Sequence, residues 1–252
     1  MDISVISFNI RHCNDKNGHS VLERIPRIFG ILKEENADVI GLQEVRPHWE
    51  DALKENLLKD YDMFLKYRAE APDIEASPIF WKRDKFTLIK SGYFWYSDTP
   101  NVQSKGWDEV YDCHRMCCFV LLKEKVSNKE FLFINTHFGF GDNCQVKSAD
   151  LIKKHSNDFK NLPIFITGDF NMTPDTKGYK QMTKYFTDVN TVTENYSGIT
   201  YHGYYEKNVN GMHIDYCFIN DNVKAKTYKL LDKTFDGKFP SDHYGLKLEL
   251  EL

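Results

Sequence analysis

The sequence lacks the run of about 20 consecutive apolar residues that a membrane-spanning helix requires, since Asn, Asp or Lys breaks its longest apolar stretches within a few positions. It also lacks a basic excess, because 33 Lys and Arg stand against 37 Asp and Glu, a formal net charge of −4. We therefore exclude a membrane-spanning protein and disfavour a binder that grips nucleic acid through a broad basic surface. A small anionic substrate, held locally, is compatible with this balance.

The six cysteines are scattered and contain no Cys-x-x-Cys pair. The N-terminal residues lead directly into an alternating strand pattern, without the basic start, apolar run and small-residue cleavage site of a secretory signal. Together these absences favour free thiols in a reducing compartment over a disulfide framework. We expect a cytoplasmic location.

The composition is that of a globular protein, with 41% hydrophobic and 28% charged residues over 252 positions. No linker or low-complexity tract divides the chain, so we expect one domain over residues 1–252. Apolar spacing predicts four helices, at 21–36, 47–58, 144–160 and 175–185. The helix over 21–36 has Leu22 and Ile25 on its apolar face, and it tolerates Pro26 only if it begins near that residue.

Between and after these helices, strand-like patterns recur along the whole chain. They cover residues 2–9, 38–43, 62–67, 76–82, 86–95, 116–122, 130–136, 163–167, 213–219, 223–231 and 244–250. The mixture of both kinds of element favours an α/β (α+β) fold in which two sheets pack face to face with helices outside.

Aromatic residues make up 14% of the chain and crowd into a few segments. The clearest are 93–96, Trp107 with Tyr111, and 201–205. These rings could surround the mouth of a site and stack on a base, a sugar or a lipid headgroup. Alternatively many of them, Phe94 and Trp95 above all, simply fill the core.

Polar side chains gather where the predicted strands end or begin. Taken singly, each has an ordinary structural explanation, such as a cap or an Asx turn. Their joint occurrence at strand boundaries indicates a site along one edge of the fold. The clusters are Ser7-Phe8-Asn9, Gln43-Glu44, Asn135-Thr136-His137, Gly168-Asp169-Phe170-Asn171, Ile214-Asp215-Tyr216 and Ser241-Asp242-His243.

This set supplies what metal-assisted phosphoester hydrolysis requires. Carboxylate and amide oxygens suit Mg²⁺ or Mn²⁺. A histidine with an acidic partner can act as general base for an attacking water. Asn and a second His can stabilise the negative charge that develops on the phosphate oxygens.

In this order, the motifs resemble those of the endonuclease/exonuclease/phosphatase superfamily, which includes pancreatic DNase, apurinic endonucleases, bacterial sphingomyelinases, inositol-polyphosphate phosphatases and deadenylases. The resemblance runs from Asn9 to His243. It implies a four-layered α/β sandwich, with two mixed β-sheets face to face and helices outside. The stretch Ser104 to Asp108 is similar to one found in compact bacterial members. Thr136-His137-Phe138-Gly139 replaces the Tyr-x-Pro-Asn motif of apurinic endonucleases, which disfavours abasic-site cleavage.

The resemblance also implies a role for each matching residue. Glu44 corresponds to the principal metal ligand, with Asn9 beside it and Asp242 contributing. His243 corresponds to the general base, oriented by Asp215. The remaining implied roles concern water and phosphate: Asp169 positions the nucleophilic water, Asn171 donates to the transition-state phosphate, and His137 and Arg115 contact the phosphate. Trp107 is a further candidate for substrate binding, and Arg115 could equally be an ordinary strand-end charge.

We therefore expect a monomeric, divalent-metal-dependent phosphoesterase that uses Mg²⁺ or Mn²⁺. It would hydrolyse a phosphodiester or phosphomonoester by in-line attack of water activated by the His243–Asp215 pair. The alternative is an endonuclease or exonuclease acting on DNA or RNA, in the manner of a deadenylase. A third possibility is a binding protein that has kept the scaffold without activity, which the filled acid, base and metal positions disfavour.

Overall fold

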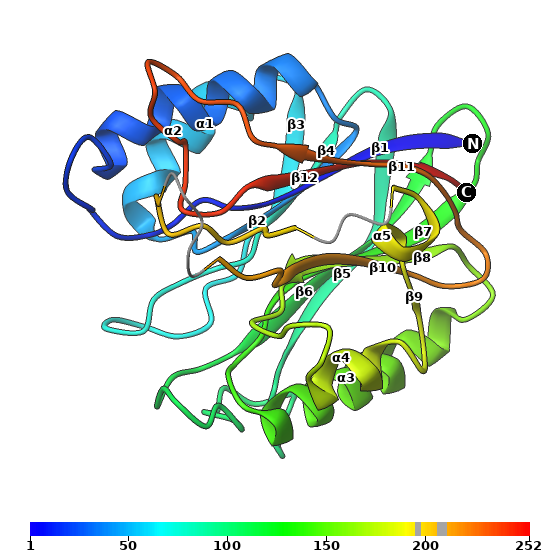
Figure 1. Ribbon diagram of the computed structural model, residues 1–252. Coiled ribbons are helices and arrows are strands. Elements are labelled where there is room, and N and C mark those ends of the chain that lie inside the picture. The colour runs from blue at the N-terminus through cyan, green and yellow to red at the C-terminus, as the bar shows by residue number, and fades with distance from the viewer. Residues whose placement is uncertain (195–197, 206–210) are drawn as a thin grey trace.

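Two stacked β-sheets with helices on their outer faces form the protein (Figure 1). The computed structural model describes residues 1–194, 198–205 and 211–252. Helices α1 (Val21–Glu35) and α2 (Glu50–Asn56) cover the upper sheet in this view, and α3 (Asp142–Ser156) and α4 (Lys177–Met182) cover the lower sheet. The predicted four-layered α/β sandwich is confirmed.

The first sheet combines strands from both ends of the chain in the order β11-β12-β1-β2-β4-β3. Only β1 and β2 run parallel, and the other neighbours are antiparallel, so the sheet is mixed. Its strands are β1 (Asp2–Asn9), β2 (Val39–Gln43), β3 (Tyr61–Phe64), β4 (Ile79–Lys82), β11 (Lys224–Leu231) and β12 (Gly245–Glu251).

The second sheet is built from the middle of the chain in the order β5-β6-β7-β8-β10-β9. Here only β7 and β8 are parallel. Its strands are β5 (Phe86–Trp95), β6 (Met116–Glu124), β7 (Glu130–His137), β8 (Ile164–Asp169), β9 (Thr187–Asp188) and β10 (Asp215–Ile219). Each sheet thus contains one strand–helix–strand unit, β1-α1-β2 in the first and β7-α3-β8 in the second, because a parallel pair needs a long crossover.

Short helices complete the description. They are the 3₁₀ turns η1 (Pro47–Trp49) and η2 (Asn157–Phe159) and the single turn α5 (Val189–Val192). Among the described residues, no helix has both the length and the apolarity needed to cross a membrane.

Three apolar clusters hold the layers together. Between the sheets, Ile3 and Val5 of β1 pack in one cluster with Phe131 and Phe133 of β7. A second cluster joins the first sheet to α1 and α2, and a third joins the second sheet to α3 and α4. Burying this apolar surface at about 25 cal/mol per Å² supplies the main driving force for the stacking.

The two-residue period of the strands decides where the polar strand ends point. In β7, Phe131 and Phe133 face the opposite sheet, so His137 at the strand end faces it as well. The parallel strands of each sheet end at the same edge, and β10 begins there because Asp215 pairs with Asp169 of β8. The chemistry-bearing residues therefore meet between the sheets at one edge.

The first helix lies where it was predicted, at Val21–Glu35 against an expected 21–36, but Pro26 is inside the helix and not at its start. Helix α1 begins at Val21, five residues before Pro26, because Ser20 accepts a hydrogen bond from the Glu23 amide and Glu23 bonds back to Ser20. This capping box satisfies the amides that the first turn leaves unpaired. Leu22 does not lie on the apolar face, since it is 80% exposed.

Candidate active site

A pocket of about 440 Å³ opens at the edge where the strands end. Most of the residues expected at a site line it: Glu44, Arg115, His137, Asp169, Asn171, Asp242 and His243. Asn9 and Asp215 are fully or almost fully buried and hydrogen-bond to residues of this lining. The structure therefore brings together nine of the predicted site residues, with Trp107 as the exception.

His243 and Asp215 form a buried pair. Nδ1 of His243 lies 2.9 Å from Oδ2 of Asp215, and Nε2 lies 3.8 Å from Oδ2 of Asp169. With Nδ1 occupied by Asp215, Nε2 is the nitrogen left to exchange a proton in the pocket. This is the arrangement that orients a histidine as a general base.

Glu44, Asp169 and Asn9 meet at the seam between the sheets. The Nδ2 amino group of Asn9 donates to Oε1 of Glu44 at 3.1 Å and to Oδ2 of Asp169 at 2.9 Å. Oε2 of Glu44 accepts from the backbone amide of His12 and also contacts the His12 ring. In this arrangement the Asn9 amide nitrogen, not its oxygen, faces the carboxylates. Its Oδ1 accepts from the Arg11 amide.

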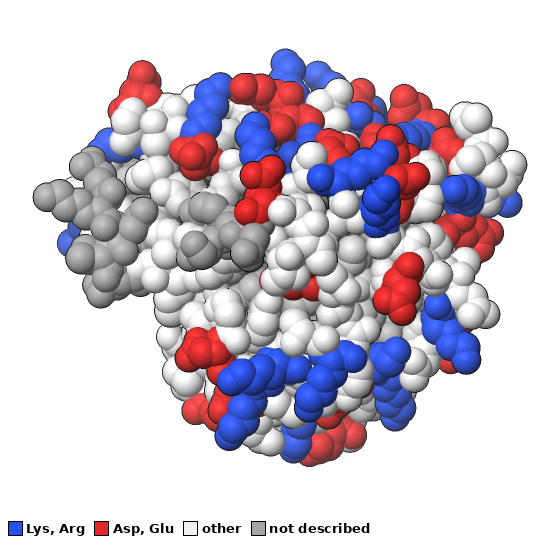
Figure 2. Space-filling view, turned by 45° about the vertical axis from the view of Figure 1, so that its right-hand side comes forward, with Lys and Arg blue, Asp and Glu red and all other residues white. Residues whose placement is uncertain are grey.

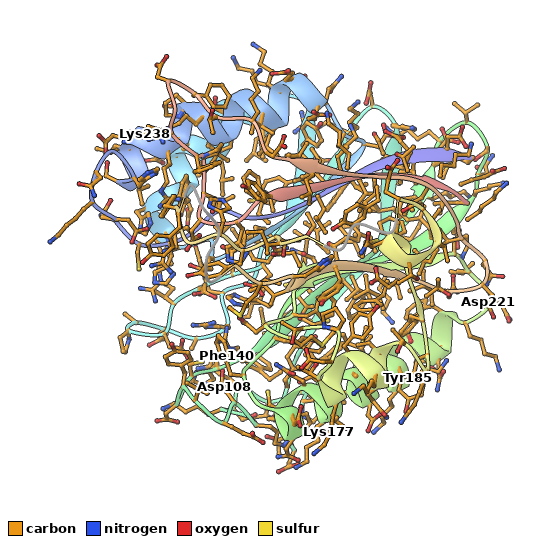
Figure 3. All side chains as sticks on the ribbon, viewed as in Figure 1. Asp108, Phe140, Lys177, Tyr185, Asp221 and Lys238 are labelled. Carbon is orange, nitrogen blue, oxygen red and sulfur yellow. The ribbon has the colours of Figure 1, made fainter. Side chains whose placement is uncertain are left out.

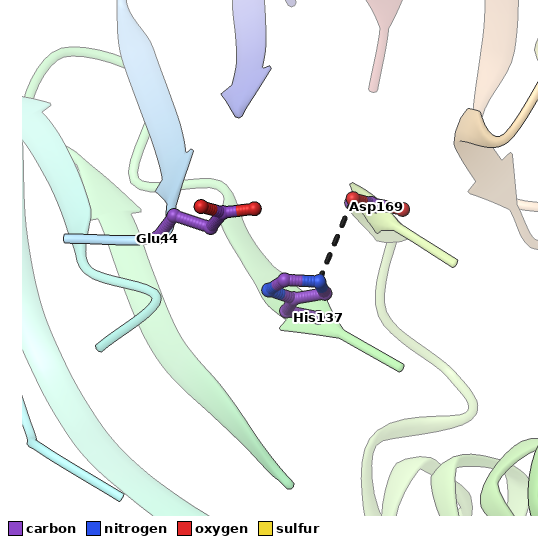
Figure 4. A group of neighbouring side chains, drawn as sticks. All are labelled: Glu44, His137 and Asp169. Carbon is purple, nitrogen blue, oxygen red and sulfur yellow. Dashed lines mark ion pairs between the residues drawn. The ribbon is translucent and has the colours of Figure 1, made fainter. Parts of the chain in front are cut away.

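His137 lies between two buried carboxylates. Nε2 of His137 is 3.5 Å from Oδ2 of Asp169, the pair marked in Figure 4. On its other side, Nδ1 is 3.2 Å from Oε1 of Glu75, a residue that the sequence did not single out. Glu75 is held in turn by Arg68, whose Nη1 donates to it at 2.8 Å. His137 is thus fixed in orientation from behind, with a ring nitrogen directed at the pocket.

Several buried carboxylates lie close together in the site, and their mutual repulsion and burial shift the pKa values of the groups around them. Burial raises the pKa of Asp169 and of Asp242 above the ordinary value, and the neighbouring carboxylates Asp215 and Glu44 add to the respective shifts. Burial opposes a charged His243, but Asp215, Asp169 and Asp242 outweigh it and raise the pKa of His243 to about 10. The carboxylates therefore hold His243 protonated at neutral pH in the chain by itself.

These residues fit a divalent cation. Glu44, His137 and Asp169 each offer a ligand atom, and these atoms lie within 4.8 Å of one another. The side chains of Glu44 and Asp169 come from different sheets and face each other across the seam (Figure 4). Buried carboxylates crowded in this way are stabilised by a bound cation or by protonation. The donor set, mostly oxygen, is typical of Mg²⁺ or Mn²⁺.

Asn171 and Arg115 lie on the second-sheet side of the pocket. The Asn171 amide donates to Asp169 Oδ1 at 2.9 Å, and its side chain donates to the Phe138 carbonyl at 2.9 Å, which leaves one N–H for a ligand. Arg115 is 5% exposed and donates from Nε to Asp108 at 3.0 Å. Arg115 is therefore a buried, ion-paired residue of the pocket lining and not an ordinary surface charge.

The aromatic residues divide between core and pocket. Phe94 and Trp95 are buried in the core, as the alternative explanation held. Tyr201 packs edge-on against His243, and Tyr111 packs edge-on against Phe140, all within the pocket lining. Tyr111 is 55% exposed, so its ring is available to a ligand.

Trp107 is not among the residues that line the pocket. Its indole N–H donates to Asp98 at 3.1 Å, and the Lys147 ammonium lies 5.1 Å from its ring centre. Asp108, the next residue, meets the pocket wall instead, and Figure 3 places it beside Phe140 at the end of the molecule opposite Asp221. Trp107 therefore contacts Asp98 and Lys147 and does not line the pocket.

Sequence reasoning missed several pocket residues, all of them outside the strand ends. Arg11 and Arg46 each follow a site residue by two positions, so proximity to Asn9 and Glu44 could have indicated them. Arg68 and Glu75 lie in an irregular segment, which pairing between Val45 and Ala76 brings to the site. No local pattern in the sequence marks that pairing.

A buried histidine–carboxylate pair and a cluster of buried acidic and histidine side chains that could hold a cation thus lie together at the edge of a stacked α/β sandwich. The family model for the Endonuclease/Exonuclease/phosphatase family matches residues 6–243, and the chain belongs to this family. Its members are hydrolases that act on phosphoester bonds.

Similar solved structures include bacterial members of the family. A family protein from Bacteroides thetaiotaomicron is 30% identical, with 99% of this chain and 97% of that chain covered and a TM-score of 0.91. A mannosyl-6-phosphatase from the same organism is also 30% identical, with 99% and 100% covered and a TM-score of 0.88. The 3'-5'-exoribonuclease subunit Ccr4 of the CCR4-Not complex of Candida albicans is 25% identical over 178 residues, which are 58% of this chain and 22% of the length of Ccr4.

Proposed function

We propose that this chain is a divalent-metal-dependent enzyme that hydrolyses a small phosphate ester, a phosphomonoester or a phosphodiester. The observation that carries the proposal is the His243–Asp215 pair at 2.9 Å, directed at a pocket that Glu44, Asp169 and Asn171 also line. The pocket volume of about 440 Å³ is within the range for small-molecule sites, about 300–1,000 Å³.

In this mechanism water attacks phosphorus in line with the leaving oxygen. Asp169 holds the water, and Nε2 of His243 takes its proton while Asp215 stabilises the imidazolium that forms. The free N–H of Asn171, together with His137 and Arg115, donates to the phosphate oxygens as their negative charge grows.

Mg²⁺ or Mn²⁺ would be held at Glu44, which belongs both to the group with His137 and Asp169 and to the expected set with Asn9 and Asp242. There it would neutralise charge on the phosphate and supply a Lewis acid. For Asn9 to offer its oxygen to a cation, its side-chain amide would have to turn and give up the hydrogen bond that this oxygen accepts from the Arg11 amide. His243 can act as a base only after it loses its proton, so the carboxylates around it need compensating positive charge. A divalent cation is a source of that charge.

Two variants test the proposal. We expect His243→Ala to lower kcat by about 10²- to 10⁴-fold. We expect Glu44→Gln to abolish the turnover that Mg²⁺ or Mn²⁺ supports in the wild type. The measurement is phosphate release from a panel of sugar phosphates, nucleotides and phosphodiesters, with Glu55→Gln on the exposed face of α2 as a control. Full activity in both site variants, with unchanged melting temperature, would contradict the proposal.

A sugar phosphate is the first substrate class to screen. The support comes from the mannosyl-6-phosphatase, which the chain matches over nearly its whole length. The exposed ring of Tyr111, packed on Phe140 at the pocket, offers a flat apolar surface of the kind that stacks on a sugar face.

The second candidate is a nuclease, supported by the similarity to Ccr4 and by one surface. Exposed lysines gather over α3 and α4 in the lower part of Figure 2. Both helices begin shortly after pocket residues, α3 after Phe140 and α4 after Asn171, so Lys147 and Lys177 stand near the path of a strand that leaves the pocket.

A nuclease would bind DNA or RNA with a steep salt dependence, because phosphate contacts release counterions. The double variant Lys147→Glu/Lys177→Glu should then reduce the slope of log K against log salt by about 2. Binding titrations over a range of salt concentrations measure this, with Lys224→Glu on β11 as the control. A shallow slope that the variant leaves unchanged contradicts the nuclease.

Three further features belong to the proposal. Residues 1–252 act as one domain, since the site takes side chains from both sheets. A monomer is the state that we propose, since the described pocket lining is built from one chain. A cytoplasmic location agrees with the six cysteines, which are all free thiols.

A further inference from the structure

Four arginines line the pocket, and three of them are engaged by carboxylates of the protein. Arg11 pairs with Asp15 at 3.1 Å and with Asp242 at 3.4 Å. Arg68 is held by Asp73 and Glu75, and Arg115 by Asp108. Each of these three guanidinium groups therefore already has a carboxylate partner within the protein.

Arg46 differs from the other three. Its side chain makes no hydrogen bond or ion pair with any residue that the structure describes, and its Nε is buried without a partner. A buried N–H without an acceptor costs about 1–3 kcal/mol. Arg46 has no acceptor among the described residues, so its guanidinium can donate hydrogen bonds to an acceptor on the ligand. The planar guanidinium matches the geometry of a carboxylate or a phosphate.

The position of Arg46 separates it from the phosphate donors. It follows β2 of the first sheet, two residues after Glu44, and the next two residues, Pro47 and His48, are exposed. His137 and Asn171 contact the reacting phosphate in the proposed mechanism. His137 ends β7 of the second sheet, and Asn171 follows β8 of the same sheet by two residues. Arg46 therefore lines the pocket from the side of the first sheet, next to exposed residues of the chain.

We propose that Arg46 binds a second anionic group, a phosphate or a carboxylate, that the substrate carries in addition to the ester that is hydrolysed. The substrate class is then a small doubly anionic phosphoester. This inference rests on the proposed function for the identity of the reacting group, but the binding of the second anion can be measured without turnover.

The test uses phosphonates, which contain no ester bond. Alkane diphosphonates of two to six carbons are titrated into the protein in the presence of Mg²⁺, beside alkyl monophosphonates and ω-carboxyalkyl phosphonates of the same length. We expect the protein to bind at least one doubly anionic ligand about 10- to 100-fold more tightly than its singly anionic partner. The carboxyl series shows which anion the site prefers.

Arg46→Ala should reduce that ratio to about one while leaving monophosphonate binding unchanged, and Arg46→Lys should retain part of it because the charge remains without the planar fork. Arg83→Ala, an exposed arginine paired with Asp62 at the end of β4, is the matched control and should retain the full ratio.

Three results overturn the inference: no preference for doubly anionic ligands, a preference that survives Arg46→Ala, or an equal loss of monophosphonate binding in that variant. The last result would place Arg46 on the reacting phosphate. An Arg46-dependent preference in a protein that hydrolyses no ester would contradict the proposed function and leave this inference standing.

Discussion

Three pocket residues hold their side chains on a left-handed backbone. The φ angles are 57° at Arg11, 61° at Glu44 and 49° at Asn171. This conformation suits Asn but costs about 1–2 kcal/mol for Arg or Glu. Such strain persists where the surroundings fix it and where the site gains from it. At Glu44, the bonds from Asn9 and His12 hold the carboxylate in the pocket against this cost.

A buried carboxylate outside the site should control part of the pH dependence of stability. Asp188 is the N-cap of α5 and accepts hydrogen bonds from the Asn190 amide and the Tyr179 hydroxyl, each at 3.0 Å. Burial nevertheless raises the pKa of Asp188 to about 6. Since the folded pKa lies above the unfolded value of 3.8, the stability it contributes is complete below that value and is lost as pH rises through 6.

We therefore expect Asp188→Asn to increase the free energy of unfolding at pH 8 by about 1–3 kcal/mol and to remove this dependence between pH 4 and 7. An Asn can still cap the helix, so the cap is retained. Urea denaturation of wild type and variant at several pH values measures the difference, with the exposed Asp221→Asn as control. A variant less stable than wild type at pH 8 would show that the charged form is stabilised after all.

The sequence predicts site residues well where a strand end places them. Asn9, His137 and Asp169 end strands, Glu44 follows one and Asp215 begins one, so their common place at one edge could be inferred. Trp107 could not be placed in this way, because the segment before Arg115 contains no regular element that fixes where a side chain points.

At the scale of elements, a layer of buried polar groups separates the apolar core from the site. Gln43 Nε2 of β2 donates to Asn135 Oδ1 of β7 at 2.7 Å, and Thr167 Oγ1 of β8 donates to the same oxygen at 3.1 Å. The Asn135 amide donates in turn to the Leu42 carbonyl at 2.8 Å. These bonds join the two sheets directly beneath the catalytic groups and fix their separation.

Gly41 permits this close approach. A Cβ at Gly41 would lie 2.6 Å from Asn135 Oδ1 and 2.9 Å from Thr167 Oγ1. We expect Gly41→Ala to lower the free energy of unfolding by about 1–3 kcal/mol, because the sheets must separate or the polar layer must break. Chemical denaturation measures this loss.

Gly30→Ala, inside α1, is the matched control. Its Cβ would meet only the Phe235 ring at 3.3 Å, and alanine favours a helix over glycine by about 1 kcal/mol. We expect this variant to be near neutral. Equal losses of unfolding free energy in Gly41→Ala and Gly30→Ala would contradict the proposed importance of the close contact at Gly41.

Regular elements with clear apolar periods could be predicted, and the structure confirms most of them within a few residues. The two-residue β9 and the single turn α5 could not, because elements so short contain no complete period. Helix α1 occupies its predicted range, and the Ser20–Glu23 capping box fixes its start five residues before Pro26, which was expected only close to the start. In the second turn, proline removes one backbone hydrogen bond, and the cap and the packing of the helix outweigh that loss.

At the scale of the whole molecule, the strand order was beyond sequence reasoning by periodicity. In the first sheet β1 pairs with β12, and Asp2 lies opposite Glu251. No local sequence pattern predicts a strand partner so distant along the chain. The sandwich itself was expected from the resemblance to the family. The positions of the polar residues at strand boundaries then sufficed to place the site along one edge, whichever strands were neighbours.

The pairing of β1 with β12 has a consequence for the order of folding. All six strands of the second sheet lie between Phe86 and Ile219, whereas the first sheet must join strands from the two ends of the chain. Contacts between distant segments form late because closing a long loop costs entropy before any contact repays it. We expect pulse-labelling hydrogen exchange during refolding to protect β7 and β8 before β1 and β12. Asp242 and His243 shortly precede β12, so the proposed general base is the last part of the site to reach its place, and an early folding intermediate lacks the His243–Asp215 pair.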